Sequence, residues 1–321
     1  KLYKKFMKIL VTGGNGFIGA KIVELLCKKH SVTILDNNDT YGLLSQSALQ
    51  KLISWRQRDW TKVNHIIGDV RDQMIGLKAF KSSPDIVIHL ASYPRAKIVQ
   101  TNPVEGVSQI VDGTVNMLWH AEKFGCKKFV YISSSMVYGN YKDNTKEDAD
   151  TKPMNIYGEA KLTGERIVKL FCKDKGIKYS IVRPSGVYGP GDLPDRVISK
   201  FFQAAMANQT LTVHNGQNKV DFTYREDTAK GICQVALSKN SNRSFNITYG
   251  KARTLRDAAE LVIKTCNSKS KIVDTGRNSL YPDRGALNIS RAKRLCKYKP
   301  KWNLEKGLKK YYDWLLKQEN V

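Results

Sequence analysis

Tyr157 and Lys161 are four positions apart in the segment YGEAKLTGERIVKL, and their side chains could share one reaction. Residues at i and i+4 lie on the same face of a helix, so the ammonium would stand beside the phenol. A cation there favours the phenolate and lowers a pKa that starts at about 10, which would make the tyrosine a base near neutral pH. The alternative is a surface pair without a chemical role.

The same spacing occurs in Tyr93/Lys97 and Tyr138/Lys142. A proline interrupts the first pair and disfavours a regular helix, whereas the second pair spans a glycine in a loop. Only Tyr157/Lys161 begins a segment with helical periodicity, so this pair is our candidate for catalysis.

A glycine pattern near the start of the chain, KILVTGGNGFIG, indicates a ligand site. A short apolar run typical of a buried parallel strand leads into Gly13, Gly16 and Gly19, and an apolar helical stretch follows. Glycines allow a tight turn and a close approach of backbone N–H groups to a pyrophosphate, and the helix N-terminus adds partial positive charge. The pattern predicts a dinucleotide site that includes Phe17 and Ile18. The alternative is a glycine-rich turn without a ligand.

Two acids at expected strand ends extend this prediction. Asp36 ends the segment SVTILD, where an acid accepts hydrogen bonds from the adenosine ribose and repels a 2′-phosphate, so it favours NAD over NADP. Asp69 ends a later strand in GDVRD and could meet the adenine amine. Because Asn37, Asn38 and Asp39 follow Asp36, a turn-forming aspartate is the alternative for that position.

Strand and helix signals alternate through the first half of the chain, which predicts a Rossmann-type α/β fold, a doubly wound parallel sheet. The expected strands are residues 9–11, 31–36, 65–69, 85–92, 127–135 and 178–185, and the expected helices include 104–124 and 157–175. After the Gly/Pro-rich segment 186–195 come helices at 197–208, 256–266 and 306–317 and short strands at 211–214 and 244–248. We predict an NAD-binding domain over residues 7–188, to which about 217–250 returns, and a smaller C-terminal α/β substrate lobe over 189–321.

The composition suits a globular protein of 321 residues, with 41% hydrophobic residues and a net charge of +25. We find no window that resembles a membrane span. The six cysteines are far apart and lack metal-ligand or disulfide spacing, so we expect no metal and a reducing cytoplasm. The spread of the lysines leaves surface usage or attraction of an anionic substrate as explanations, and the lack of an arginine-rich tract disfavours nucleic-acid binding. We expect residues 1–6 to be a leader before a natural start at Met7.

The motifs TGGNGFIG, GDVRD, IHLAS, ISSSMVYG, YGEAK and RPSGVYGPG occur in the order found in extended short-chain dehydrogenases/reductases. The chain resembles their NAD-dependent nucleotide-sugar epimerase/dehydratase branch from about Lys8 to Tyr312, and is most similar to UDP-glucose 4-epimerase-like members. Besides the glycine loop and Asp36, the resemblance implies NAD contacts at Asn37, Asp69, Val70, Leu90, Ala91, Ser92, Ser133, Tyr157, Lys161 and Pro184.

The resemblance also implies a third catalytic residue, Ser134, three positions before the valine of V-Y-G, which would hydrogen-bond the reacting sugar oxygen. Ser133 would then face the cofactor and Ser135 the substrate, with plain solvation of a strand end as the alternative. Dehydratases of this branch have Asp and Glu directly after the hydroxyl residue, where this chain has Ser135 and Met136. Neither side chain transfers a proton at neutral pH, so the departure favours an epimerase.

A nucleotide sugar carries a diphosphate, and cationic groups should converge on it. The family usually has an arginine before the acid of a D-F-x-Y segment, where this chain has Val220. Arg284 is our first choice as a replacement, and we expect residues 95–102 to close over the sugar. The candidate substrate contacts are Lys97, Asn116, Ser135, Met136, Tyr188, Lys219, Arg225 and Arg284. For the cationic ones, a solvated basic face is the alternative.

Together these features predict an NAD-dependent nucleotide-sugar 4-epimerase that oxidises its substrate to a 4-keto sugar and returns the hydride to the other face. Lys161 and the oxidised nicotinamide would together favour the Tyr157 phenolate. The alternatives are a 4-reductase or dehydratase of the same branch and a non-catalytic, RNA-binding member of the fold. The resemblance further implies a homodimer built on helices 104–124 and 157–175.

Overall fold

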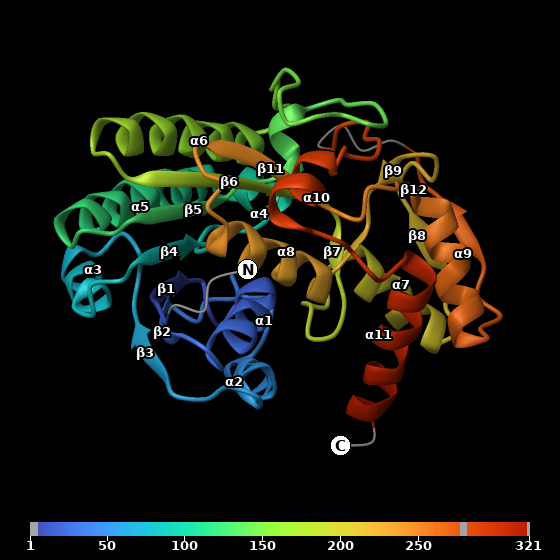
Figure 1. Cartoon of the computed structure of the whole chain (residues 1–321). Helices are drawn as coiled ribbons and strands as arrows, with labels where there is room; N and C mark the ends of the chain where they lie inside the picture. Colours follow the sequence, from blue (N-terminus) through green and yellow to red (C-terminus); the bar gives the residue numbers. More distant parts are fainter. Residues whose placement is uncertain (1–5, 277–280, 320–321) are drawn as a thin grey trace.

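The structure is a computed structural model that describes residues 6–276 and 281–319, so most of the expected leader lies outside the described residues. Within them, seven parallel strands form one sheet in the order β11-β6-β5-β4-β1-β2-β3 (Figure 1). These strands are β1 (Lys8–Thr12), β2 (Ser31–Asp36), β3 (Val63–Ile67), β4 (Ile86–His89), β5 (Lys128–Ile132), β6 (Lys178–Pro184) and β11 (Arg243–Ile247). The predicted doubly wound α/β fold is confirmed.

Helices cover both faces of the sheet, which explains why the central strands β1, β4 and β5 are mainly apolar and buried. One face packs against α1 (Phe17–Leu26), α8 (Arg225–Leu237) and α10 (Ser290–Cys296). The other packs against α3 (Gln73–Phe80), α5 (Pro103–Lys123) and α6 (Ile156–Asp174). Successive residues of a strand point to opposite faces, so Ile9 and Val11 enter the first core and Leu10 enters the second. The same lobe contains α2 (Gln46–Gln57), α4 (Ala96–Thr101) and the 3-10 helix η1 (Ser135–Tyr138).

A second lobe lies beyond the carboxyl ends of the strands, on the right of Figure 1. Its helices α7 (Val197–Met206), α9 (Leu255–Cys266) and α11 (Leu304–Glu319) enclose a separate apolar core. Short paired strands complete it: β7 (Val187–Tyr188) with β10 (Thr223–Tyr224), β8 (Leu211–Val213) with β13 (Ile272–Asp274), and β9 (Lys219–Val220) with β12 (Arg253–Thr254).

The strand predicted at residues 244–248 is β11, and it lies in the main sheet, within the segment of about 217–250 that we expected to return to the NAD-binding domain. It pairs in parallel with β6, with Phe245 opposite Val182. Helices α8 and α10 pack beside it. The chain therefore crosses into the second lobe, returns to extend the sheet, and crosses again.

Among the described residues, no helix has the length and apolarity needed to cross a membrane.

Candidate active site

A cavity of about 1470 Å³ separates the two lobes at the carboxyl ends of the central strands. It is lined by residues of the glycine loop, of β2 and β5, of the segment that follows β4, of α4 and α6, and of the second lobe. A cavity for one drug-sized ligand measures about 300–1,000 Å³, so this one has room for two ligands side by side.

The glycine loop forms one end of the cavity. Gly13 has a φ of +71°, which a residue with a side chain rarely adopts, and a Cβ on Gly19 would stand 2.0 Å from the Gly13 carbonyl oxygen. Gly16 begins α1 without a side-chain cap, so the first N–H groups of the helix stay available to an anion. Gly13, Gly16, Phe17, Ile18 and Gly19 all line the cavity, as predicted.

Asp36 lies at the end of β2 and its carboxylate is held by the backbone. One oxygen accepts from Asn15 N (2.9 Å) and the other from Asn38 N (2.8 Å). Burial raises the pKa of Asp36, and these backbone bonds and the nearby Arg56 act against that rise. Asp36 and Asn37 line the cavity, where the carboxylate can meet a ribose.

Asp69 differs from the prediction. Its carboxylate forms hydrogen bonds with the Arg71 guanidinium (2.7 and 3.1 Å) and with Gln109 Nε2 (2.9 Å), and these bonds hold its pKa below the usual range. Asp69 is not among the described lining residues, whereas its neighbour Val70 is. An adenine amine would therefore compete with an arginine for this carboxylate.

The other strand-end residues predicted to contact the cofactor do line the cavity: Leu90, Ala91, Ser92, Ser133, Tyr157, Lys161 and Pro184. The Ser133 hydroxyl, however, donates to Glu165 Oε1 at 2.6 Å, so its proton already has an acceptor within the protein.

The three predicted catalytic residues come together. Ser134 and Tyr157 both line the cavity, and the Ser134 hydroxyl acts on the phenol by lowering its pKa. The Lys161 ammonium donates to the carbonyl oxygen of Ile132, the last residue of β5, at 2.9 Å. The helix α6 thus brings Tyr157 and Lys161 to the strand end that carries Ser134.

The electrostatics of Tyr157 differ from the prediction. Burial raises the pKa of the phenol, and the Ser134 hydroxyl and the charge of Arg196 lower it less than burial raises it. Burial also lowers the pKa of Lys161 to about 7, with Glu165 acting against this. The polypeptide alone therefore does not acidify the phenol, because the expected lysine charge is itself weakened by desolvation.

A buried ion pair between Glu165 and Arg183 supports this site from the protein interior. Glu165 is fully buried and binds Arg183 through both oxygens (2.6 and 2.8 Å). Arg183 also donates to the Tyr138 hydroxyl (2.9 Å) and to the Glu147 carbonyl oxygen (3.0 Å). The sequence analysis missed Glu165, although it follows Lys161 by four positions and so lies on the same helical face.

Ser135 and Met136 are buried and line the cavity next to Ser134. The carboxylates among the described lining residues are Asp36 and Asp39 at the end of β2, and Asp192 and Asp195 in the second lobe. Neither of the last two is free, because Asp192 pairs with Arg196 and Asp195 with Arg95.

Of the predicted substrate contacts, Lys97 and Arg284 line the cavity, as do Ser135 and Met136. Lys97 lies in the exposed first turn of α4, within the segment 95–102 expected to cover the sugar. Arg284 is desolvated, which lowers its pKa, and its Nε has no hydrogen-bond partner. A cation without a full set of partners suits a diphosphate.

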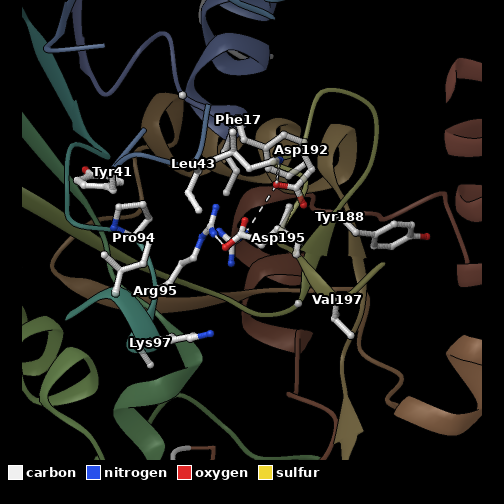
Figure 2. A pocket seen from close by; sticks show the side chains of 18 of the residues that line it. Phe17, Tyr41, Leu43, Pro94, Arg95, Lys97, Tyr188, Asp192, Asp195 and Val197 are labelled. Atoms are coloured by element: carbon white, nitrogen blue, oxygen red, sulfur yellow. Dashed lines mark hydrogen bonds and ion pairs between the residues drawn. The ribbon is translucent and has the colours of Figure 1, made fainter. Parts of the chain in front are cut away.

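Four predicted substrate contacts are engaged within the protein, although one of them, Tyr188, does line the cavity. Tyr188 is 2% exposed and belongs to the core of the second lobe, where its hydroxyl bonds Leu304 O at 3.4 Å. Its ring points away from the cavity centre in Figure 2. Asn116 donates to Val70 O at 2.8 Å and Lys219 pairs with Asp143 at 3.1 Å, so both lie outside the described lining.

Arg225 is the fourth. It is 5% exposed, donates to Pro190 O at 2.9 Å, and stacks over the rings of Phe17 (5.3 Å) and Trp55 (5.7 Å). It therefore supports the glycine loop and the segment after β7, outside the described cavity lining.

The sequence analysis also missed a cluster of charged residues in the cavity. Arg95 precedes α4, and Asp192, Asp195 and Arg196 precede α7. Figure 2 shows Arg95 reaching across the cavity to Asp195. Arg56 of α2 donates to Asn15 O and to Gly191 O, both at 2.7 Å, and so ties the glycine loop to the second lobe. No spacing rule links such residues, because the fold brings them together from distant segments.

Comparison with known proteins identifies the family of this chain. The model of the NAD dependent epimerase/dehydratase family matches residues 9–248. The chain belongs to this family. Members are NAD-dependent, and the uncapped start of α1, the glycine cradle and the Asp36 carboxylate fit a dinucleotide.

Solved structures of this epimerase/dehydratase family have the same fold. A Bacillus cereus UDP-glucuronic acid 4-epimerase, solved with UDP-glucuronic acid and NAD, is 26% identical, with a TM-score of 0.89 over 97% of this chain and 100% of that one. A Thermotoga maritima UDP-glucose 4-epimerase with UDP-glucose is 25% identical, with a TM-score of 0.88 over 98% and 100%. The mouse dTDP-D-glucose 4,6-dehydratase is 27% identical over 97% of this chain and 89% of its own length. Similarity alone therefore leaves both reaction types open.

Proposed function

We propose that this protein is a nucleotide-sugar 4-epimerase, of the UDP-glucose/galactose type, that uses NAD. The observation that carries the proposal is that Ser134 and Tyr157 line one cavity with room for two ligands, with Ser135 and Met136 where a dehydratase needs an acid and a base. An epimerase needs only one proton-transfer group and one oriented sugar oxygen, and this pair supplies both.

The chain's own residues account for the proton movement. Tyr157, as the phenolate, takes the proton of the sugar 4-hydroxyl, and Ser134 hydrogen-bonds the same oxygen as it becomes a ketone. Bound NAD supplies the hydride acceptor and, in its oxidised form, a positive charge that favours the phenolate. Lys161 adds a second, partial charge below the phenol. The 4-keto sugar then turns over in the cavity, and Tyr157 returns the proton on reduction from the other face.

A dehydratase or a net reductase is the alternative within the family. Elimination of water across C5 and C6 needs a base and an acid beside the sugar, and Met136 provides neither. Two of the described cavity carboxylates, Asp192 and Asp195, lie in the second lobe. Each forms an ion pair with an arginine. Both observations support epimerisation.

The substrate diphosphate would be held in the second lobe by Arg284, with Lys97 facing the sugar from α4. Arg284 lines the cavity, and burial lowers the pKa of its guanidinium. It would replace the arginine that the family usually has at the position of Val220. Lys219 and Arg225 do not serve, since both are engaged elsewhere.

The test is incubation of the purified protein with UDP-glucose, UDP-galactose, UDP-glucuronate and dTDP-glucose, with NMR of the products and absorbance at the NADH wavelength. We expect one substrate pair to interconvert at C4 with no net NADH. A 4-keto-6-deoxy product would assign a dehydratase, and stoichiometric NADH formation or consumption would assign a dehydrogenase or reductase.

We further propose that the protein is a homodimer that works in a reducing compartment, the cytoplasm. Exposed apolar side chains on α5, Val115 (44%) and Trp119 (43%), and on α6, Leu170 (72%), support a dimer, because α5 and α6 pack side by side. All six cysteines are free thiols, which suits a reducing environment.

A further inference from the structure

Arg95 lies at the junction of β4 and α4 in an unusual backbone conformation. Its φ of 105° and ψ of 132° fall outside the regions open to residues with a side chain. Such conformations persist where surrounding structure over-determines them, and they cluster at ligand clamps. The strain directs the Arg95 side chain into the cavity, where it is 8% exposed.

The partner of Arg95 comes from the other lobe. Its Nη1 pairs with Asp195 Oδ2, in the segment between β7 and α7, as Figure 2 shows. The pair is incomplete: Arg95 Nε and Asp195 Oδ1 are both buried without a hydrogen-bond partner. The neighbouring Asp192 Oδ2 and Arg196 Nε are unpartnered in the same way.

An arginine fork binds a phosphate or carboxylate best through two parallel bonds, and Asp195 provides only one contact. Burial and the nearby Arg196 also lower the pKa of Arg95 to about 10, which shows how poorly the charge is compensated. The Asp195 side chain is 30% exposed, so it can be released toward solvent when another anion takes its place.

We propose that Arg95 is a ligand-binding residue that exchanges partners: in the free protein it pairs with Asp195, and in the complex it binds a phosphate or carboxylate of the ligand. The identity of the ligand rests on the proposed function, but the exchange itself does not. Asp195 acts as a stand-in anion that keeps the guanidinium in place across the cavity and competes with the ligand for it.

The test compares wild type, Arg95→Gln and Asp195→Asn by isothermal titration with UDP, UDP-glucose and UDP-glucuronate, and by the NAD content per chain after dialysis. We expect Arg95→Gln to weaken binding of the responsible ligand by about ten-fold or more, the value of a charge-assisted pair. We expect Asp195→Asn to do the opposite and tighten it by about three-fold or more, because the competing carboxylate is gone.

The three probes and the NAD content identify the anion. A loss of NAD from Arg95→Gln assigns the dinucleotide phosphates, weaker binding of all three UDP ligands assigns the substrate diphosphate, and an effect on UDP-glucuronate alone assigns a sugar carboxylate. Arg294→Gln, which removes an exposed arginine on α10, is the matched control and should change none of these values.

Unchanged binding of every probe in both variants would overturn the proposal. So would weaker binding in Asp195→Asn, since that result makes the pair a structural link between lobes rather than a competitor. Thermal unfolding of each variant checks that it is folded. Because binding is measured without turnover, a failure of the proposed epimerase activity leaves these outcomes readable.

Discussion

Tyr157 carries a phenol that the polypeptide holds in its protonated form. Burial raises its pKa, and Lys161, which should oppose this, has its own pKa lowered to about 7 by the same desolvation. A base at position 157 therefore needs the positive charge of the bound cofactor. In the mechanism that we propose, coupling of this kind would restrict proton abstraction to the complex in which the hydride acceptor is present.

Removal of the phenol tests this role. We expect Tyr157→Phe to lower kcat by about 10³-fold, within the range for a lost general base, while NAD remains bound. Ser134→Ala should lower kcat by about 10- to 100-fold, since it removes one hydrogen bond to the reacting oxygen. Product formation by NMR and NAD content by absorbance check both, and a variant Tyr157→Phe with wild-type kcat would refute the assignment.

The buried ammonium of Lys161 predicts a pH dependence of stability. In the folded chain it loses its proton above about pH 7, whereas in the unfolded chain it keeps it up to about 10.4, so the unfolded state binds more protons between these values. The free energy of unfolding from this group therefore rises with pH through this window, by at most about 1.4 kcal/mol per pH unit.

Urea unfolding of wild type and Lys161→Met at pH 7, 8 and 9 measures this effect. The difference in free energy of unfolding, wild type minus variant, should increase with pH. Comparison with the variant removes the contributions of other groups that titrate there, such as Lys128, whose pKa burial lowers to about 8. A difference that is constant with pH would show that Lys161 keeps its ordinary pKa.

At the scale of elements, α6 positions the site through the pair Glu165–Arg183, which joins this helix to β6 and, through Ser133, to the end of β5. Breaking a fully buried pair from one side leaves an uncompensated charge. We expect Glu165→Gln to lower the free energy of unfolding by about 3–5 kcal/mol.

An exposed pair provides the matched control. Glu305 and Arg253 are 39% and 46% exposed, and Glu305→Gln should cost less than about 1 kcal/mol. Urea unfolding of the two variants gives both values. Equal costs would mean that the Glu165 pair contributes no more than a surface contact.

How far the sequence predicts these elements depends on the kind of signal. The helices expected at 104–124 and 157–175 are α5 (Pro103–Lys123) and α6 (Ile156–Asp174), because each has one apolar face against the sheet. By contrast, α2 was not predicted, since only Ile53 and Arg56 among its residues are buried and its apolar pattern is weak.

The positions of side chains were likewise predictable only where a regular pattern sets them. Residues at the strand ends could be placed in the cavity because parallel strands bring their carboxyl ends to one edge. The burial of the Tyr188 ring could not be predicted, because in a two-residue strand the direction of a side chain is set by the packing of the second lobe, where this ring meets Tyr224 and Phe222. Arg95 and Asp195 are 100 positions apart, and only the closed fold makes them partners.

At the scale of the whole molecule, the outer faces of α5 and α6 would provide the surface for the second copy in the dimer that we propose. We expect Trp119→Glu to convert a dimer into a monomer in multi-angle light scattering, because a charge would be buried among apolar side chains. Val273→Glu is the control, since Val273 is similarly exposed (49%) but lies on β13 in the second lobe. A wild-type protein that elutes as a monomer would contradict the dimer.

Arg56 links the two lobes through hydrogen bonds. Its guanidinium is fastened to a carbonyl of the glycine loop at one end and to Gly191 at the other, and it is 5% exposed. Any escape route for a dinucleotide that passes between these segments requires at least one of these two buried hydrogen bonds to break. The coenzyme should therefore behave as a prosthetic group, with a residence time much longer than one catalytic cycle. NAD should stay bound to the protein during gel filtration.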